Sequence, residues 1–130
     1  MLSMQTELFK KNAIILLSDD NQQLLYKDIL SANGFVVKLA GSVGELVKSI
    51  NRDTNLVMIC ADSVDNESTQ LITAAIAKQP FKIAFIGLTV SNEKRDDIQT
   101  LRLPMVIDRF LDEIMRLSDQ QSEDECLSMM

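Results

Sequence analysis

The stretch that decides the fold is Ala13-Ile14-Ile15-Leu16-Leu17, which is followed directly by Ser18-Asp19-Asp20-Asn21. A short, continuous apolar run of this kind is typical of a strand that is buried on both faces of a sheet. The polar residues after it are of the types that cap helices. Apolar residues then follow at helical spacing from Leu24 to Leu30, and Asn33-Gly34 ends the pattern. This segment therefore predicts one strand–helix unit of a parallel sheet.

The same alternation of apolar runs and helical spacing continues along the chain. Further strands are predicted over 35–39, 56–60, 83–88 and 105–107. Helices are predicted after Ser42, over 67–78, over 92–99 and from Phe110 to Leu117, and Ser42 with Glu45 has the pattern of a capping box. Five strands that alternate with helices predict an α/β fold, in which an open, parallel five-stranded sheet carries helices on both faces. The expected architecture is a (βα)5, flavodoxin-like single domain.

This domain is expected to span residues 12–117. Residues 1–11 then form an N-terminal extension. Residues 118–130 carry Asp119, Glu123, Asp124 and Glu125 among polar residues, and they are expected to form an acidic, flexible tail. A linker toward a further domain is the alternative interpretation of that tail.

The composition excludes several kinds of chemistry. The 130 residues include no histidine, which removes Ser-His-Asp and Cys-His nucleophile pairs and imidazole metal sites. Cys60 and Cys126 cannot by themselves hold a structural zinc ion, and they form no disulfide framework, so a reducing cytoplasm is expected. The net charge of −6 argues against direct binding of nucleic acid. No apolar stretch approaches the length of a signal peptide or membrane span, so no membrane association is expected.

Functional groups of parallel α/β sheets gather at the carboxyl ends of the strands. The polar and reactive residues predicted at these ends are Ser18, Asp19 and Asp20 after the first strand, Cys60 and Asp62 after the third, Thr89 and Ser91 after the fourth, and Asp108 and Arg109 after the fifth. The expected site is therefore a cluster of acids and hydroxyls with one arginine and one thiol.

As an ordered set, these features resemble the receiver domain of bacterial two-component response regulators, the CheY-like family. The resemblance covers Asn12 to about Leu117. It rests on the order of elements, the acids Asp19-Asp20, the segment Gly87-Leu88-Thr89-Val90, the segment from Ser42 to Leu46, and the aromatic Phe110 in the last helix. The resemblance implies a phosphoacceptor aspartate at the end of the third strand, a Mg²⁺ ion held by two acids after the first strand, a hydroxyl after the fourth strand and a lysine after the fifth.

The resemblance assigns some of these positions to matching residues. Thr89 corresponds to the switch hydroxyl, and Asp19 with Asp20 correspond to the metal-binding acids. Counting back from Gly34 brings Ser18 into the place of the second acid instead, so both assignments stay open. Asp19 or Asp20 also serves equally well as an N-cap of the first helix.

The other two positions depart from the pattern. Counting from Glu45 places Cys60 at the phosphoacceptor position, and a thiol there cannot form an acyl phosphate. Counting from Phe110 places Asp108 at the lysine position, where it replaces a cation by an anion. A two-residue slip would make Asp62 the acceptor, with Arg109 as the cation. The competing interpretation is that Asp62, together with Ser63, caps the following helix.

We therefore expect a non-enzymatic signal-transduction module, a pseudo-receiver that acts by phosphorylation-independent protein–protein interaction or dimerisation through the region Asn92 to Leu117. No cofactor is expected, although Mg²⁺ is possible. The first alternative is a conventional receiver that uses Asp62, Mg²⁺ and a sensor kinase. The second is a small flavodoxin-like ligand-binding domain, which has little support because no Gly-rich phosphate loop follows the first strand. A redox role for Cys60 is not expected, because a reactive thiol needs basic neighbours.

Overall fold

The computed structural model describes residues 11–91, 98–103 and 107–116. Its centre is a parallel sheet of five strands in the order β2-β1-β3-β4-β5. The strands are β1 (Lys11–Leu16), β2 (Phe35–Leu39), β3 (Thr54–Cys60), β4 (Ala84–Thr89) and β5 (Gln99–Arg102). The helices are α2 (Asp20–Ser31), α3 (Val43–Ser49) and α4 (Asn66–Ala77), and residues 107–116 are also helical. The predicted α/β fold with a five-stranded parallel sheet is confirmed.

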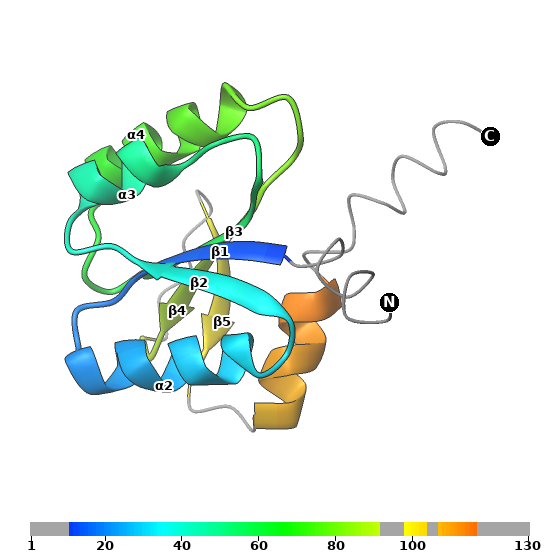
Figure 1. The fold of residues 1–130 in the computed structure, drawn as a ribbon. Coiled ribbons are helices and arrows are strands. Elements are labelled where there is room, and N and C mark those ends of the chain that lie inside the picture. Colours follow the sequence, from blue (N-terminus) through cyan, green and yellow to red (C-terminus); the bar gives the residue numbers. More distant parts are fainter. Residues whose placement is uncertain (1–10, 92–97, 104–106, 117–130) are drawn as a thin grey trace, which may run out of the picture.

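Helices cover both faces of this sheet, with α3 and α4 on one face and α2 with helix 107–116 on the other (Figure 1). Each face has its own apolar core. On the α3–α4 face, Leu46 and Ile72 pack with strand residues such as Ile59, and all three are fully buried. Because side chains alternate between the faces along each strand, the central strands contribute to both cores. This explains why their sequences are almost continuously apolar.

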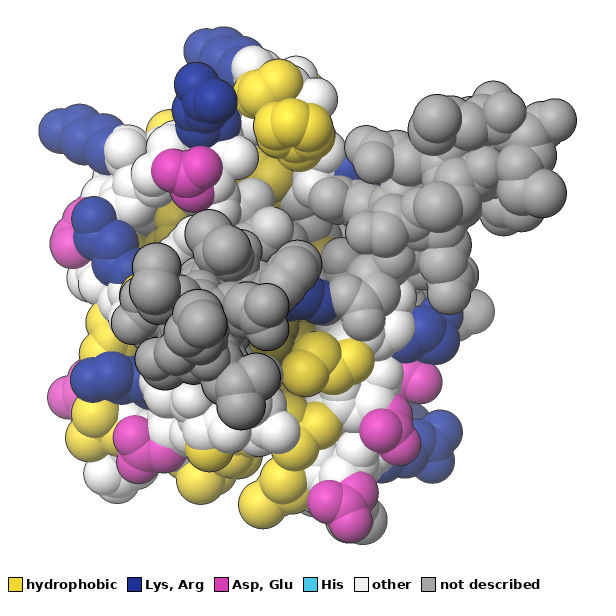
Figure 2. All heavy atoms as spheres, turned by 45° about the vertical axis from the view of Figure 1, so that its right-hand side comes forward, with side chains coloured by type: hydrophobic (Ala, Val, Ile, Leu, Met, Phe, Trp, Pro, Cys, Tyr) yellow, Lys and Arg dark blue, Asp and Glu magenta, His cyan; other side chains and the backbone are white. Residues whose placement is uncertain are grey.

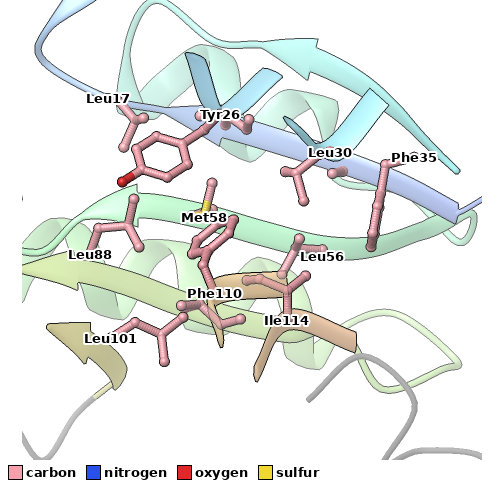
Figure 3. Packing of buried hydrophobic residues seen from close by; sticks show 13 residues of the cluster. Leu17, Tyr26, Leu30, Phe35, Leu56, Met58, Leu88, Leu101, Phe110 and Ile114 are labelled. Atoms are coloured by element: carbon pink, nitrogen blue, oxygen red, sulfur yellow. The ribbon is translucent and has the colours of Figure 1, made fainter. Parts of the chain in front are cut away.

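The core on the α2 face is built around an aromatic pair. The rings of Tyr26 and Phe110 have centroids 5.0 Å apart and are tilted by 48°. Figure 3 shows both rings close to Met58, a residue of β3 that is fully buried. Phe110 and Ile114, with 2% and 0% of their surface exposed, therefore attach helix 107–116 to the sheet as its helical spacing predicts.

Polar side chains fix where the helices begin. Asp19 is the N-cap of α2, because its Oδ1 accepts hydrogen bonds from the backbone N–H groups of Asn21 and Gln22 at 2.8 and 3.3 Å. Ser42 caps α3 by accepting from the N–H of Glu45, whose carboxylate accepts in turn from the N–H of Gly41. Both predicted caps are confirmed, and each satisfies backbone donors that the helix itself leaves unpaired.

The prediction of the fifth strand is wrong in position. The strand was expected over 105–107, but β5 is Gln99–Arg102, and Ile107 is already helical. The physical reason is that β5 lies at the edge of the sheet and is short, with Leu101 as its buried side chain, so its sequence carries little apolar signal. The predicted helix over 92–99 is contradicted at Gln99, which begins β5, and its residues 92–97 lie outside the described part.

The predicted ends of the domain are not described by the structure. The extension assigned to 1–11 is described at Lys11 alone, which opens β1, and the tail assigned to 118–130 lies outside the described residues. Within the ranges that are described, no helix is long and apolar enough to cross a membrane.

Candidate functional site

A cavity of about 400 Å³ opens at the carboxyl ends of the first three strands. β1 has neighbours on both sides, so the connections that leave β1 and β3 diverge here, as at the ligand sites of open α/β sheets. Polar groups line the cavity together with aliphatic ones, and the polar lining comprises Ser18, Asp20, Gln23, Ser42, Cys60 and Ser63. The cavity lies at the edge of the sheet where the sequence predicts that the polar residues gather.

Cys60 ends β3 and forms part of the cavity wall. The Ser63 hydroxyl lies 3.4 Å from the Cys60 Sγ and 3.1 Å from the Ser18 Oγ. This corner thus joins a half-buried thiol to two hydroxyls, one from the turn after β3 and one from the segment after β1. The side chain that β3 contributes to the cavity at its carboxyl end is therefore a thiol.

Asp62 is directed toward β4. The hydroxyl of Thr89 donates to its Oδ1 at 2.6 Å, and the backbone N–H of Val90 donates to its Oδ2 at 2.9 Å. The same Thr89 Oγ1 accepts from the backbone N–H of Ser91 at 3.0 Å. An O–H to carboxylate distance of 2.6 Å is typical of a charge-assisted hydrogen bond. Asp62 therefore links the turn after β3 to the end of β4.

The interpretation of Asp62 and Ser63 as caps of the following helix is wrong. The N-cap of α4 is Asp65, whose carboxylate accepts from the N–H of Ser68 at 2.8 Å. Several polar residues of cap-forming type stand between β3 and α4, so the sequence alone does not show which of them begins the helix. The cap lies three residues beyond Asp62, and this leaves the Asp62 carboxylate available for Thr89 and Val90.

The acids after β1 have separate surroundings. Asp19 uses Oδ1 for the helix cap, whereas Asp20, the first residue of α2, lines the cavity. Among the residues that the structure describes, no three Asp, Glu, Cys or His side chains come together as ligands for a metal ion. A hard dication such as Mg²⁺ needs several oxygen ligands. Asp20 is the one carboxylate in the described lining of the cavity, so this lining lacks the carboxylate pair that the resemblance implies and does not fit Mg²⁺.

The prediction that Asp108 and Arg109 directly follow the fifth strand is wrong. Both are exposed residues in the first turn of helix 107–116, and β5 ends at Arg102. Leu103 comes next, and its backbone N–H donates to the carbonyl of Thr89 at 2.7 Å. The misplaced strand caused this error, and it also hid Arg102, which is the register partner of Thr89.

The fold was compared with known proteins. No protein-family model and no curated protein sequence matches the chain. Among solved structures, a CheY-like receiver domain protein from Methanospirillum hungatei superposes with a TM-score of 0.72 at 22% identity, over 88% of this chain and 98% of that one. The signal receiver domain of a putative Luxo repressor protein from Vibrio parahaemolyticus gives a TM-score of 0.70 at 12% identity, over 92% and 98%.

A third similar structure was solved with ligands. It is the response regulator protein TrrA from Thermotoga maritima in complex with Mg²⁺-BeF, with a TM-score of 0.66 at 18% identity, over 82% of this chain and 98% of that one. The three similar structures are matched over 98% of their own length. The chain therefore has the fold of the CheY-like response regulator receiver domains.

Proposed function

We propose that this chain is a receiver-like signalling module that acts without phosphorylation, by binding a protein partner or a second copy of itself. The observation that carries the proposal is the thiol of Cys60 at the end of β3, in the wall of the cavity at the carboxyl edge. A thiol has no carboxyl oxygen to attack a phosphoryl donor, so no acyl phosphate forms at this position. The module is accordingly expected to catalyse no reaction.

The surroundings of Asp62 support the same proposal. Its two carboxylate oxygens accept hydrogen bonds from Thr89 and Val90, so phosphorylation would have to replace at least one of these bonds. Thr89, the hydroxyl that a receiver would use to bind a phosphoryl group, is 7% exposed and already bonded to this carboxylate. In this arrangement the Thr89 hydroxyl is bonded to Asp62 without any phosphoryl group. No step through Mg²⁺ is assigned, because the donors present do not fit it.

The proposed contact surface lies within the region Asn92 to Leu117, of which residues 98–103 and 107–116 are described. β5 is an edge strand, and an edge strand is open to pairing or packing with another chain. Ile107, at the start of the following helix, is 52% exposed although it is a large apolar residue. An exposed apolar side chain at the start of the helix that follows the edge strand supports a protein contact in this region.

The first experiment tests phosphorylation. The full chain is incubated with acetyl phosphate and Mg²⁺, and separately with beryllofluoride and Mg²⁺, and followed by intact mass and by the backbone amide spectrum. We expect no mass increase and no saturable shift. A saturable adduct that disappears in Asp62→Asn would overturn the proposal and establish the conventional receiver, whose acceptor lies 2.6 Å from the Thr89 hydroxyl. A matched Asp65→Asn variant changes a cap and not the candidate acceptor.

The second experiment tests the contact surface. Sedimentation of the full chain over a range of concentrations is compared for Ile107→Ser and for Leu71→Ser, a control on α4 with a similar exposed fraction of 57% against 52%. We expect Ile107→Ser alone to weaken self-association or the binding of a purified partner. Equal behaviour of the two variants contradicts this surface. A chromophore in the absorbance spectrum of the purified chain would instead favour the ligand-binding alternative.

A further inference from the structure

Four cations and one exposed aromatic ring lie on loops and helix ends at the amino edge of the sheet, the edge opposite to the cavity. The loops before β3 and before β4 lie side by side there, because these strands pair with Leu56 opposite Ala84. The exposed residues of these loops and of the nearby helix ends form the amino-edge patch, which comprises Lys48, Arg52, Lys78, Phe81 and Lys82.

This patch is unusual for the chain as a whole. The protein carries 13 Lys and Arg against 19 Asp and Glu, so acids outnumber bases in the whole chain. In the two loops, residues 50–53 and 78–83, Asp53 is the one acidic residue, and three residues are Lys or Arg. Phe81 is 57% exposed, whereas Phe35 and Phe110 are nearly completely buried. Figure 2 shows Lys and Arg side chains gathered beside exposed hydrophobic ones at the top of the molecule, where α4 leads into β4. A positive patch that includes an exposed aromatic residue is suited to an acidic peptide that also carries apolar residues.

We propose that the amino-edge patch binds residues 118–130 of this same chain. That segment carries Asp119, Glu123, Asp124 and Glu125 and no Lys or Arg, so its charge is complementary to the patch. It also carries Leu127, Met129 and Met130. Methionine side chains adapt to irregular surfaces and make favourable sulfur contacts with aromatic rings, which suits them to Phe81.

The path of the chain brings the segment to the correct edge of the sheet. Helix 107–116 follows β5, and the helix after a parallel strand runs back toward the amino ends of the strands. Figure 1 shows its last turn near the beginning of β1. From Arg116, residues 117–130 span up to about 45 Å when extended. A domain of this size is roughly 35 Å across, so the segment can cross the edge from the α2 face to the α4 face.

Residues 118–130 belong to the same chain as the amino-edge patch, so weak contacts are sufficient to hold them on it. A tethered segment is present at an effective concentration in the millimolar range, so a modest affinity for the patch occupies it in most molecules. Because the attraction is mainly between exposed charges, it is expected to weaken as the Debye length falls from about 10 Å at 0.1 M salt to about 3 Å at 1 M. The proposal is independent of the function proposed above, since it involves neither Cys60 nor Asp62.

The experiment uses Cys126, which lies inside the segment. In a full chain carrying Cys60→Ser, Cys126 is the remaining thiol of the two, and a nitroxide label is attached to it. We expect the label to broaden the backbone amide signals of Arg52, Lys78, Phe81 and Lys82, and we expect the broadening to be lost at high salt. Arg52→Gln combined with Lys78→Gln should reduce it strongly. Lys27→Gln combined with Lys38→Gln, on α2 and β2, removes equal charge elsewhere and should leave it unchanged.

Three outcomes would overturn the proposal. The first is an absence of broadening at the patch in the labelled chain. The second is equal broadening in the two pairs of charge variants, which would show that the patch does not hold the segment. The third is broadening that also arises in a mixture of isotope-labelled chains without nitroxide and nitroxide-carrying chains without isotope, because contact would then come from a second copy. The amide spectrum of each variant shows directly whether it is folded.

Discussion

Thr89→Val tests the link between Asp62 and the end of β4. Valine keeps the shape of threonine but removes the hydroxyl, and with it the 2.6 Å bond to Asp62 and the 3.0 Å bond from the N–H of Ser91. A hydrogen bond to a charged group contributes about 1.5–3 kcal/mol and a neutral one about 0.5–1.5 kcal/mol. Asp62 is exposed, so in the variant water can form hydrogen bonds with its carboxylate in place of the Thr89 hydroxyl. The lower ends of the two hydrogen-bond energy ranges therefore apply.

The net cost of Thr89→Val is therefore expected to be about 1–2 kcal/mol in the free energy of unfolding, after the gain from burying one more methyl group. For a domain of this size that corresponds to a fall in Tm of roughly 3–8 °C. Thr54→Val is the matched control. Thr54 is also buried, at 4% exposed against 7%, but its hydroxyl accepts from the N–H of Asn51 and does not contact Asp62.

The assay is urea unfolding of four chains, namely the original, Thr89→Val, Asp62→Ala and the double variant. Because of this bond, the sum of the two single costs in unfolding free energy should exceed the cost of the double variant by about 1 kcal/mol. Either single change already breaks the bond, so the double variant loses it only once. In the corresponding cycle with Thr54→Val, the costs should add. Additivity within about 0.5 kcal/mol for Thr89 and Asp62 would refute the reasoning.

Three further predictions concern stability. Gly87→Ala should cost about 1–3 kcal/mol by overpacking, because the new Cβ would lie 2.9 Å from the Cβ of Ala61 and 3.1 Å from the Cδ1 of Ile98; thermal unfolding measures this, and an unchanged Tm would contradict it. Phe110→Ala should cost about 3–5 kcal/mol in urea unfolding, and Phe110→Leu clearly less, because the ring is 2% exposed and packs on Tyr26. Burial raises the pKa of Tyr26 above its ordinary value of 10.0, so the unfolded chain loses this proton first as the pH rises. The stability from the protonated phenol is thus fully present below pH 10.0 and is lost above it, and Tyr26→Phe should make the fall of unfolding free energy above pH 10.0 shallower.

The residues of the central strands were sufficient to predict the class of fold. β1, β3 and β4 are covered by helices on both faces, so successive residues along each strand must be apolar. Such a continuous apolar run can be recognised from the sequence of the strand alone. The caps at Asp19 and Ser42 were equally visible, because each bonds to backbone groups only two or three residues away. By contrast, β5 was misplaced, because an edge strand of four residues imposes few apolar positions.

The candidate site shows the boundary between local and tertiary information. The sequence by itself determined that acids, hydroxyls and Cys60 would meet at the carboxyl edge, because parallel strands end on the same side of a sheet. It did not determine the partner of Asp62, which lies 27 residues from Thr89 along the chain. That contact exists because β3 pairs with β4 in a register that sets Cys60 beside Leu88 and brings the following turn against Thr89. Only the tertiary structure decided it, since the pairing of strands depends on the packing of the whole sheet.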